Sequence, residues 1–573
     1  MANSLNKKQQ YEVLRSQLEI ERATFTSHWR ELSDYILPRR LRSNMSDVNK
    51  GDKRNKYIID STATAAARVL RSGMMAGITS PARPWFKLTT PDPSLDKFGP
   101  VRNWLADAQK IMSTSYLRSN LYNTLPSVYG DLGVFGTSAM YVEEDFTGEV
   151  LWTQSFPIGS YMIAKDYKGK VNTFIRDFRM TVQQLVEQFG VTKNGKADWS
   201  NFSTAVRSAW DKGQYQTWVD VCHVIAPNMD YDKNKLNSKF KKFSSCYYER
   251  GVSGQQKDSA MDNTFLRESG YENFPVLCPR WEVTGEDVYA TSCPGMEALG
   301  DIKQLQHGEK RIMEAIDKMI RPPMIAPTSM KNQVVTQLPG DTNYSDADQP
   351  RGLRPALEVN FRVQEMQVKQ QEIRRRVDES FFKNIFLMID QMERAATATE
   401  VNERKQEKML MLGPVLEYLN QDLLDPLTDI AFNYHINQNL LPPPPPELEG
   451  MNLRVEYVSI MAQAQKMLGI SGVDRFSGFI SGLGQVDAAV YDKVKSDELV
   501  NVYADMTAVP PNIIRSDDEV AALRDTRAKQ QQAAAKQAQA AQMAQTAQTL
   551  SQTPVNQDGD TALSAMLTDA GVG

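Results

Sequence analysis

The chain has 573 residues, which is enough for several hydrophobic cores, because a single core stops growing near ~250–300 residues. Charged residues make up 24% of the sequence and hydrophobic residues 41%, a composition typical of folded globular proteins rather than disordered or fibrous ones. The formal net charge of -4 argues against tight binding of nucleic acid through phosphate neutralisation, but it does not exclude a protein that lets DNA slide past.

The N-terminal region predicts an amphipathic helical arm. Apolar residues recur at helical spacing between Gln9 and Tyr35, with charged residues between them. No stretch of the chain approaches the ~18 consecutive apolar residues of a membrane span, and the first residues lack the apolar core of a signal peptide. We therefore expect a protein of the cytoplasm, or of an assembly formed there.

A second helix is expected within DSTATAAARVLRSGMMAGITSPARPWFKL, which begins at Asp60. Asp60, Ser61 or Thr62 can cap its N-terminus, and the Ala-rich turns continue to Gly73 or Gly77. Two prolines then prevent continuation and lead into an extended segment. The small residues of this helix predict close packing against a neighbour.

The pattern shortens to that of strands between about Leu151 and Tyr289. Strand-like runs in and beside this region are SAMYVEED, KVNTFIRDF, WVDVCHVIA and FSSCYYER, and one helix, TVQQLVEQFG, interrupts them. We therefore predict a mixed α/β domain. The four cysteines of the chain form no C-x-x-C pair and are expected to be reduced, buried thiols.

Helical periodicity resumes at Pro294 and stops at Pro322 and Pro323. The apolar stripe of this helix comprises Leu299, Ile302, Leu305, Ile312, Ile316 and Met319. A segment rich in Pro, Gly and Asp follows and predicts a small β or loop module. Another helix is expected from about Phe361 to Ile389, and its apolar face comprises Met366, Ile373, Val377, Phe381 and Ile385. The pattern of helix, insertion and helix predicts a stalk with a small module at its tip.

The C-terminal third is predicted to be mainly helical. The stretch TATEVNERKQEKMLMLGPVLEYLNQDLLDPLTDIAFNYH has helical character, with a break at Gly413 and Pro414. The run Pro442 to Pro446 forms stiff polyproline II, and a rigid spacer is favoured over a ligand for a Pro-binding domain. Beyond Arg524 the Ala/Gln-rich sequence has no apolar stripe, so a long helix there needs copies of itself as partners. The last ~20 residues are expected to be disordered.

No catalytic, metal or cofactor site is predicted. The stretch FGVTKNGKAD has the spacing of a phosphate-binding loop, but Ala197 replaces the hydroxyl that binds Mg²⁺, and a helix ending at Gly190 precedes it instead of a strand. A polar turn is therefore favoured over an ATP site. The stretch DYDKNK begins like a calcium loop, but Lys235 and Lys241 replace its glycine and glutamate, so a charged hairpin is expected. The four histidines have no ligand spacing.

Positive charge is concentrated in KQQEIRRRVDESFFK, within the helix expected to end at Ile389. The residues that could meet phosphate oxygens from one side are Lys369, Arg374, Arg375, Arg376 and Lys383. They are nearly balanced by Glu365, Glu372, Asp378 and Glu379. On sequence alone a solvated face with i,i+4 ion pairs is favoured, although a mixed surface also suits a channel through which DNA slides.

Several segments together resemble the signature blocks of the podovirus head-to-tail connecting protein family, the phage portal proteins. They are DSTATAAARVLRSGMMAGITSPARPWFKL, YGDLGVFGTSAMYVEED, PGMEALGDIKQLQ, IDKMIRPPMIAP, ATATEVNERKQEKMLMLGPVLEYLNQDLLDPL and LRVEYVSIMAQAQK. These blocks occur in the order of the family and cover residues from about 10 to 525. The Ala/Gln-rich tail falls outside the resemblance.

The resemblance implies an α+β, mainly α-helical portal fold that assembles as a ring, usually of twelve subunits. The implied regions are an N-terminal helical arm of the wing at 1–59, an α/β wing at 60–294, stem helices at 295–321 and 359–389, a clip at 322–358, a tunnel loop and following helix at 390–413, a crown at 414–524, and a C-terminal barrel helix with a disordered tail at 525–573.

The implied function is a channel for DNA packaging and ejection at one capsid vertex of the virion, assembled in the host cytoplasm. The implied partners are further copies of the chain, double-stranded DNA, the terminase large subunit, the tail adaptor, the major capsid or scaffolding protein and the ejection proteins. No membrane, metal or cofactor is implied. A tail or adaptor structural protein and an ATP-driven packaging motor remain as alternatives.

Two sets of residues follow as site predictions. The predicted channel-facing residues are Lys369, Arg374, Arg375, Arg376, Lys383 and Arg394. The predicted clip residues, which would dock the terminase and later the adaptor, are Lys331, Asn332, Gln333 and Asp341.

Overall fold

The chain divides into two compact units. Unit 1 comprises Met1–Lys87, Ala108–Pro442 and Val455–Phe479, and unit 2 comprises Leu88–Asp107, Pro443–Arg454 and Ile480–Gly573. Helices predominate and the sheets are antiparallel, which agrees with the predicted α+β class. The computed structural model describes residues 6–42, 51–82, 84–92, 95, 98–190, 198–251, 264–325, 331, 354–355, 362–392, 413–448, 454–457, 473, 475–483, 493–506, 515 and 517–552.

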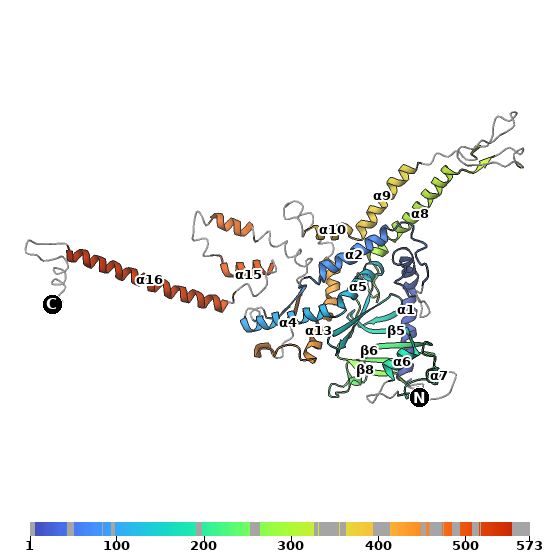
Figure 1. Cartoon of the computed structure of the whole chain (residues 1–573), viewed down its shortest axis with the longest axis horizontal. Helices are drawn as coiled ribbons and strands as arrows, with labels where there is room; N and C mark the ends of the chain where they lie inside the picture. Colours follow the sequence, from blue (N-terminus) through green and yellow to red (C-terminus); the bar gives the residue numbers. More distant parts are fainter. Residues whose placement is uncertain are drawn as a thin grey trace, which may run out of the picture. The chain divides into compact units, whose positions relative to one another are not determined.

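A five-stranded antiparallel sheet, in the order β4-β5-β6-β7-β8, lies in the part of unit 1 opposite the hairpin of α8, Pro294–Ile320, and α9, Val363–Ser380 (Figure 1). Its strands are β4 Tyr161–Lys165, β5 Val171–Thr181, β6 Trp218–Pro227, β7 Phe243–Glu249 and β8 Arg267–Tyr271. Successive residues of a strand face opposite sides of a sheet. On β6, Val221 accordingly packs in one hydrophobic core while Cys222 and Val224 pack in another. The strand-like runs predicted around these positions are confirmed.

Helices cover both faces of this sheet (Figure 1). Helix α1, Lys7–Tyr35, begins with a capping box between Asn6 and Gln9, and its Leu18 packs into the core that contains Cys222. Helices α6, Val182–Phe189, and α7, Thr204–Asp211, pack on the opposite face. Only α6 was predicted in this region. The prediction of a single helix is wrong because α7 is also present, and its eight residues offer little periodicity to recognise.

A smaller sheet and two long helices complete the central part of unit 1. The sheet has the order β3-β2-β9, with β2 Ala139–Asp145, β3 Val150–Phe156 and β9 Val276–Leu277. Helix α5, Leu121–Phe135, packs against α2, Thr62–Ile78, and a Cβ atom at Gly133 would overlap the Leu70 side chain. The close packing predicted for α2 is therefore confirmed. Helices α4, Gly99–Arg118, and α5 were not predicted.

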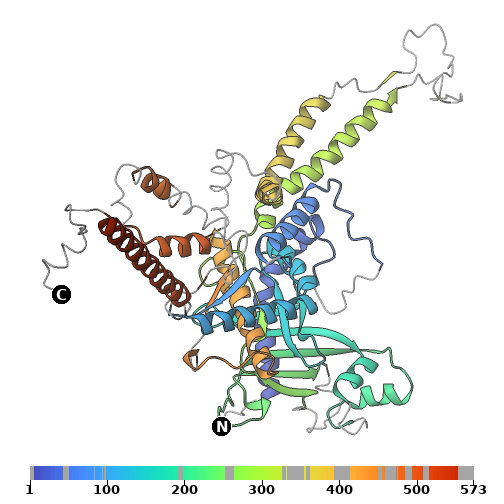
Figure 2. The same ribbon diagram turned by 60° about the vertical axis from the view of Figure 1, so that its left-hand side comes forward.

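A helical hairpin projects from unit 1, and Figures 1 and 2 both show its two long helices side by side. Its helices are α8 Pro294–Ile320, α9 Val363–Ser380 and α10 Lys383–Met392. Beyond α8, β10 Met324–Ile325 pairs antiparallel with β11 Arg354–Pro355, so part of the predicted small module is a β ribbon. The prediction of one continuous helix up to residue 389 is wrong, because the chain breaks between α9 and α10.

The remaining elements are mostly helical. They are β1 Phe86–Thr89, α12 Gly413–Leu419, the π-helix η4 Asn420–Leu424, α13 Asp425–Asn437, the 3-10 turns η1 Ser238–Phe240 and η5 Pro446–Leu448, β12 Arg454–Tyr457, α15 Ser496–Met506 and α16 Asp517–Gln552. The predicted break at Gly413 coincides with the start of α12. The segments 397–412 and 553–573, predicted as helix and disordered tail, lie outside the described residues.

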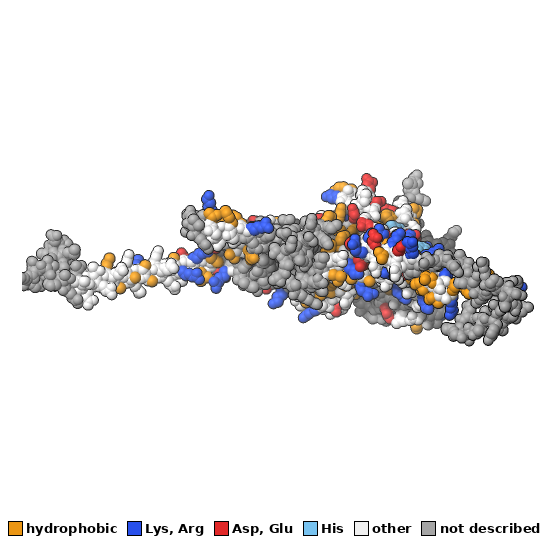
Figure 3. Space-filling model, turned by 90° about the horizontal axis from the view of Figure 1, so that it is seen from above, with side chains coloured by type: hydrophobic (Ala, Val, Ile, Leu, Met, Phe, Trp, Pro, Cys, Tyr) orange, Lys and Arg blue, Asp and Glu red, His pale blue; other side chains and the backbone are white. Residues whose placement is uncertain are grey.

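The Ala/Gln-rich sequence forms a long helix, α16, already in a single chain, whereas a long helix was expected only with copies of the chain as partners. Its 36 residues have no apolar stripe, and nearly all of its described side chains are exposed. Figure 3 shows a mostly uncharged surface along it, with basic side chains near its first turns. The helix therefore lacks the buried face that normally stabilises a helix in a single chain.

Candidate functional site

The predicted basic cluster lies on the hairpin formed by α8 and α9 and extends to the start of α10. The first two-thirds of the α8 stripe are buried, including Leu299, Ile302 and Leu305. From α9, Ile373 and Val377 are buried as well. At the crossing point a Cβ atom on Gly308 of α8 would overlap the Gln370 amide of α9. A glycine at this position of α8 thus allows the two helices to approach closely.

The break between α9 and α10 redirects the chain. Phe382 adopts a left-handed backbone conformation with φ of 55°, which is unfavourable for a bulky residue and requires compensation from packing. The Phe382 ring stacks on Trp281 at a centroid distance of 6.1 Å. One turn later Phe386 is buried against Gly73 of α2. These contacts hold α10 against α2, so α10 does not continue in the direction of α9.

Three distant segments meet at Asp60, just before α2. The Arg374 guanidinium on α9 donates hydrogen bonds to Asp60 Oδ2 at 3.0 Å and to Glu309 Oε1 on α8 at 2.5 Å. From α8, the Gln306 side chain accepts from the backbone N–H of Asp60 at 2.8 Å and donates to its carbonyl oxygen at 2.8 Å. We call Asp60, Gln306, Glu309 and Arg374 the hairpin latch.

The electrostatics of the latch favour an ionised Asp60. Burial by itself raises the pKa of this carboxyl group, but hydrogen bonds from Thr62 and Arg374 outweigh burial and hold the pKa below its ordinary value of 3.8. The Thr62 backbone N–H donates to Asp60 Oδ1 at 2.8 Å, so the same carboxylate also accepts from the first N–H group of α2, whose N-cap residue is Ser61. Asp60 was predicted as a possible cap, but its role in joining α2 to the hairpin was not.

The predicted channel-facing residues do not form one cluster of available charge. Arg374 belongs to the latch, Arg376 donates to Asp301 Oδ1 on α8 at 2.8 Å, and Lys383 donates to Asp378 Oδ2 at 2.8 Å. Each of these cations therefore has a carboxylate partner within the same hairpin. All three pairs join different helices, although the sequence favoured pairs within one helix.

The other predicted channel-facing residues differ in their surroundings. The Arg375 side chain is 73% exposed and pairs only loosely with Glu379, at 3.4 Å. Lys369 is exposed, and no carboxylate lies within ion-pair distance of it in the described part of the chain. Arg394 lies outside the described residues. Lys369 and Arg375 are thus the described members whose charge faces solvent.

The predicted clip residues are mostly beyond what the structure describes. Lys331 is exposed, and Asn332, Gln333 and Asp341 lie outside the described residues. The β ribbon of β10 and β11 stands at the base of this segment.

An uncovered apolar surface lies on the distal half of the hairpin. Ile316 and Met319, predicted to continue the buried stripe of α8, are 37% and 52% exposed. The same part of the hairpin also exposes Met313, Ile320 and Val368, at 58%, 70% and 67%. Exposed apolar residues concentrated in one short part of a helical hairpin make it a candidate for interaction with another molecule. We call these five residues the distal stripe.

Among the described residues, no group of three or more His, Cys, Asp or Glu could hold a metal ion. Gly190 ends α6, as predicted, while residues 191–197 of the phosphate-loop-like stretch are not described. All four cysteines are free and buried, which confirms their predicted state. Within the same described ranges, every helix is too short or too polar to span a membrane.

Comparison with known proteins adds independent information. A family model for the bacteriophage head to tail connecting protein matches residues 8–514. The portal protein of Salmonella phage epsilon15 is 46% identical over 558 residues, which cover 97% of both chains. The probable portal protein of Bordetella phage BPP-1 is 44% identical over 520 residues, which cover 90% of both chains. The family match includes the hairpin, the latch and both sheets and ends just before α16.

Proposed function

Because the chain belongs to the bacteriophage head to tail connecting protein family, we propose that it is the portal subunit of a phage virion. In this proposal twelve copies form a ring at one capsid vertex, and DNA passes through the central channel during packaging and ejection. The observation that carries the proposal is the similarity of nearly the whole chain to portal proteins. The ring does not act as an enzyme.

The distal stripe supports assembly of several copies. In a single chain its large apolar side chains are exposed to water. Burial of these side chains against a neighbouring copy would contribute a favourable free energy of about 25 cal/mol per Å² of apolar surface. A closed ring of identical subunits covers such a surface on every copy, since each hairpin has a neighbour on both sides. The same reasoning applies to α16, which gains a partner only if copies of it form the proposed barrel.

The hairpin would be the stem of the ring, with residues 322–358, which include β10 and β11, as the clip. A motor that hydrolyses ATP, the terminase, would dock on the clip during packaging, and the tail adaptor would replace it. The capsid or scaffolding protein and the ejection proteins would contact other surfaces of the ring. Phosphate contacts that are few per subunit and repeated around the ring would let DNA move, because they give no strong single site.

Electron microscopy of the purified chain tests this function. We expect closed rings whose central hole admits a DNA duplex. Discrete monomers under assembly conditions would favour a tail or adaptor protein instead. Appreciable ATP turnover by the purified chain would contradict the proposal in favour of a packaging motor.

A further inference from the structure

The connection between β6 and β7 displays two apolar side chains almost completely to solvent. In this segment, residues 228–242, Met229 is 97% exposed and Leu236 is 99% exposed. Exposed apolar residues are common on protein surfaces, but large side chains that touch almost nothing of their own chain are not explained by packing. We call residues 228–242 the β6–β7 loop.

The β6–β7 loop is held in shape by its own hydrogen bonds. The Asn228 amide donates to the carbonyl oxygens of Lys239 and Lys241, each at 2.8 Å. Across the loop the Asp232 backbone N–H donates to the Phe240 carbonyl at 3.1 Å, and the Lys235 ammonium lies 4.2 Å from the centre of the Phe240 ring. The backbone of the loop is thus ordered before any partner binds. Binding through its two exposed apolar side chains would therefore cost little backbone conformational entropy.

Strand β8 supports the loop from behind. A Cβ atom at Gly270 would lie 2.5 Å from the Ser238 carbonyl oxygen and 2.7 Å from that of Phe243, so this strand passes directly against the loop. Glu268 on the same strand pairs with Lys239 at 2.9 Å. The base of the loop is therefore fixed, while Met229 and Leu236 stay exposed to solvent.

The loop is also basic. It contains five lysines and two aspartates. Lys239 and Lys241 pair with Glu268 and Glu272 of the neighbouring strand region, at 2.9 and 3.6 Å. By contrast, Lys233 and Lys242 have no carboxylate partner within the described ranges. The loop thus carries two exposed apolar side chains together with positive charge that is only partly neutralised.

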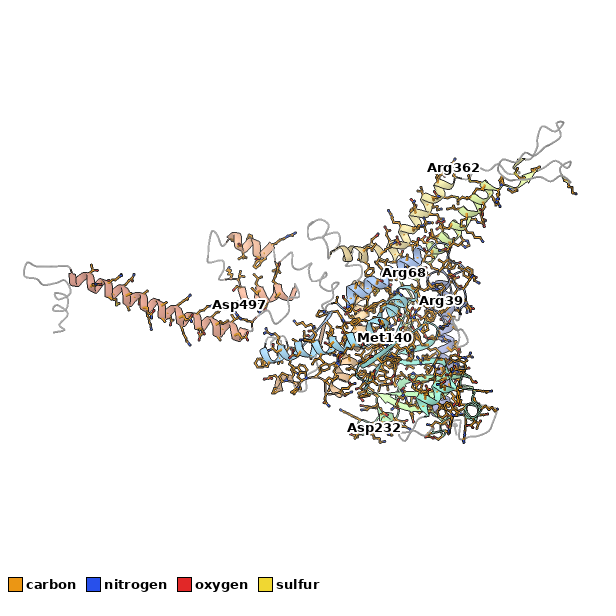
Figure 4. The ribbon with its side chains drawn as sticks, viewed as in Figure 1. Arg39, Arg68, Met140, Asp232, Arg362 and Asp497 are labelled. Carbon is orange, nitrogen blue, oxygen red and sulfur yellow. The ribbon has the colours of Figure 1, made fainter. Side chains whose placement is uncertain are left out.

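We propose that the β6–β7 loop docks on a second kind of protein, whose surface offers apolar pockets rimmed by carboxylates. Apolar anchors that enter pockets provide most of the affinity of protein interfaces, and complementary charges around them provide orientation. DNA fits this loop poorly, because phosphates give no partner to the fully exposed Met229 and Leu236. In Figure 4, Asp232 of the loop and Arg362 of the hairpin lie at opposite ends of unit 1, so the loop is separate from the distal stripe. A second copy of the chain bound through that stripe leaves the loop uncovered.

Photo-crosslinking within assembled phage heads tests the identity of the partner. Leu236 is replaced by the photoreactive residue p-benzoylphenylalanine, and the crosslinked peptides are identified by mass spectrometry. We expect a product with a different head protein, at a peptide rich in Asp and Glu. A product with a second copy of the chain or with DNA, or no product at all, overturns the proposal. The matched control is the same replacement at Tyr167, which is 92% exposed on the β4–β5 turn.

Incorporation into heads tests the importance of the contact. The double variant Met229→Ser with Leu236→Ser should lower the number of copies per purified head about tenfold, while Tyr167→Ser should leave it unchanged. Rings of the purified double variant should look like those of the unchanged chain. Loss of rings would assign the loop to contacts between copies and overturn the proposal, and so would normal incorporation. The proposal rests on the proposed portal function, and failure of that function would be recognised separately, because the purified unchanged chain would then form no rings.

Discussion

At the scale of single residues, the hairpin latch depends on one carboxylate. We predict that Asp60→Asn lowers the free energy of unfolding by about 1–2 kcal/mol at pH 7, because the amide loses the charge that binds Arg374. Asp301→Asn should cost less, since Asp301 and Arg376 are 30% and 47% exposed. Chemical denaturation of the purified variants measures both. Equal effects of the two substitutions would contradict the importance given to the latch.

The pH dependence of this effect has a definite sign. The pKa of Asp60 is lower in the folded chain than its ordinary value of 3.8. Its contribution is therefore present above that value and is lost as the pH falls through the folded pKa. The difference between the unchanged chain and Asp60→Asn should shrink when denaturation is repeated near pH 3.

A buried histidine predicts a second pH effect. His223 on β6 is 2% exposed and stacks on Tyr247 at a centroid distance of 3.7 Å. Burial, together with the nearby Arg176 and Arg267, holds its pKa well below the ordinary value of 6.5. The folded chain then binds fewer protons than the unfolded chain, so stability decreases as the pH falls below 6.5. We expect a loss of about 1.4 kcal/mol per pH unit there, absent in His223→Gln. Denaturation at pH 7.5, 6.5 and 5.5 measures it, and identical slopes would contradict the prediction.

The residue-scale sites show what the sequence could not reveal. Arg374 was placed correctly on a helix, but its partners Glu309 and Asp60 lie 65 and 314 positions away. The spacing within one helix therefore suggested ion pairs between neighbouring turns and a basic face exposed to solvent. The contact of Asp60 with the start of α2 was predictable because it depends on neighbouring residues. Lys369 and Arg375 could not be distinguished from the paired cations until the helices were placed together.

At the scale of elements, the contact between α2 and α10 depends on a glycine. A Cβ atom at Gly73 would overlap the Phe386 ring. We predict that Gly73→Ala destabilises the chain by about 1–3 kcal/mol, because α10 must move or Phe386 must leave its rotamer. The matched control is Gly300→Ala on α8, where a Cβ atom meets nothing within 4 Å. It should stabilise by up to about 1 kcal/mol through helix propensity. Denaturation midpoints measure both, and stabilisation by Gly73→Ala would refute the prediction.

The sequence predicted the position of most long helices but not how the hairpin ends. Helices α1, α2 and α8 have clear caps, small residues or prolines at their boundaries. At the break after α9 the sequence offers two phenylalanines, and the apolar periodicity continues through Phe381 and Ile385, which are both buried. No Gly or Pro marks the change. The break results from tertiary contacts with Trp281 and Gly73, which no local pattern reveals.

At the scale of the whole molecule, assembly and DNA passage should be separable. We predict that Ile316→Glu with Ile320→Glu prevents ring formation, because burying two charges in the distal stripe is costly. Leu236→Glu, a matched apolar-to-charged change on the β6–β7 loop, should leave rings intact. Native mass spectrometry and electron microscopy report the outcome. Normal rings from the stripe variant would show that the distal stripe is not part of the interface between copies.

Neutralising the two solvent-facing cations should affect DNA instead. We predict that Lys369→Gln with Arg375→Gln lowers the amount of DNA packaged or retained per head while rings still form. Arg374→Gln, from the latch, should lower stability as well. Quantification of DNA in purified heads measures the first effect. If the double variant fails to form rings, these residues belong to subunit contacts and not to the channel.

The latch also has a consequence for synthesis. Arg374 follows Asp60 by 314 residues. At a translation rate of about 5–20 residues per second, the ribosome needs roughly 15–60 s to make the second partner after the first. During that interval α2 emerges without the hairpin helices that later cover it, including the side chain that fills the space beside Gly73. The nascent chain must keep this apolar helix from aggregating until its own second half arrives, so its folding yield should depend on chaperones that bind emerging chains.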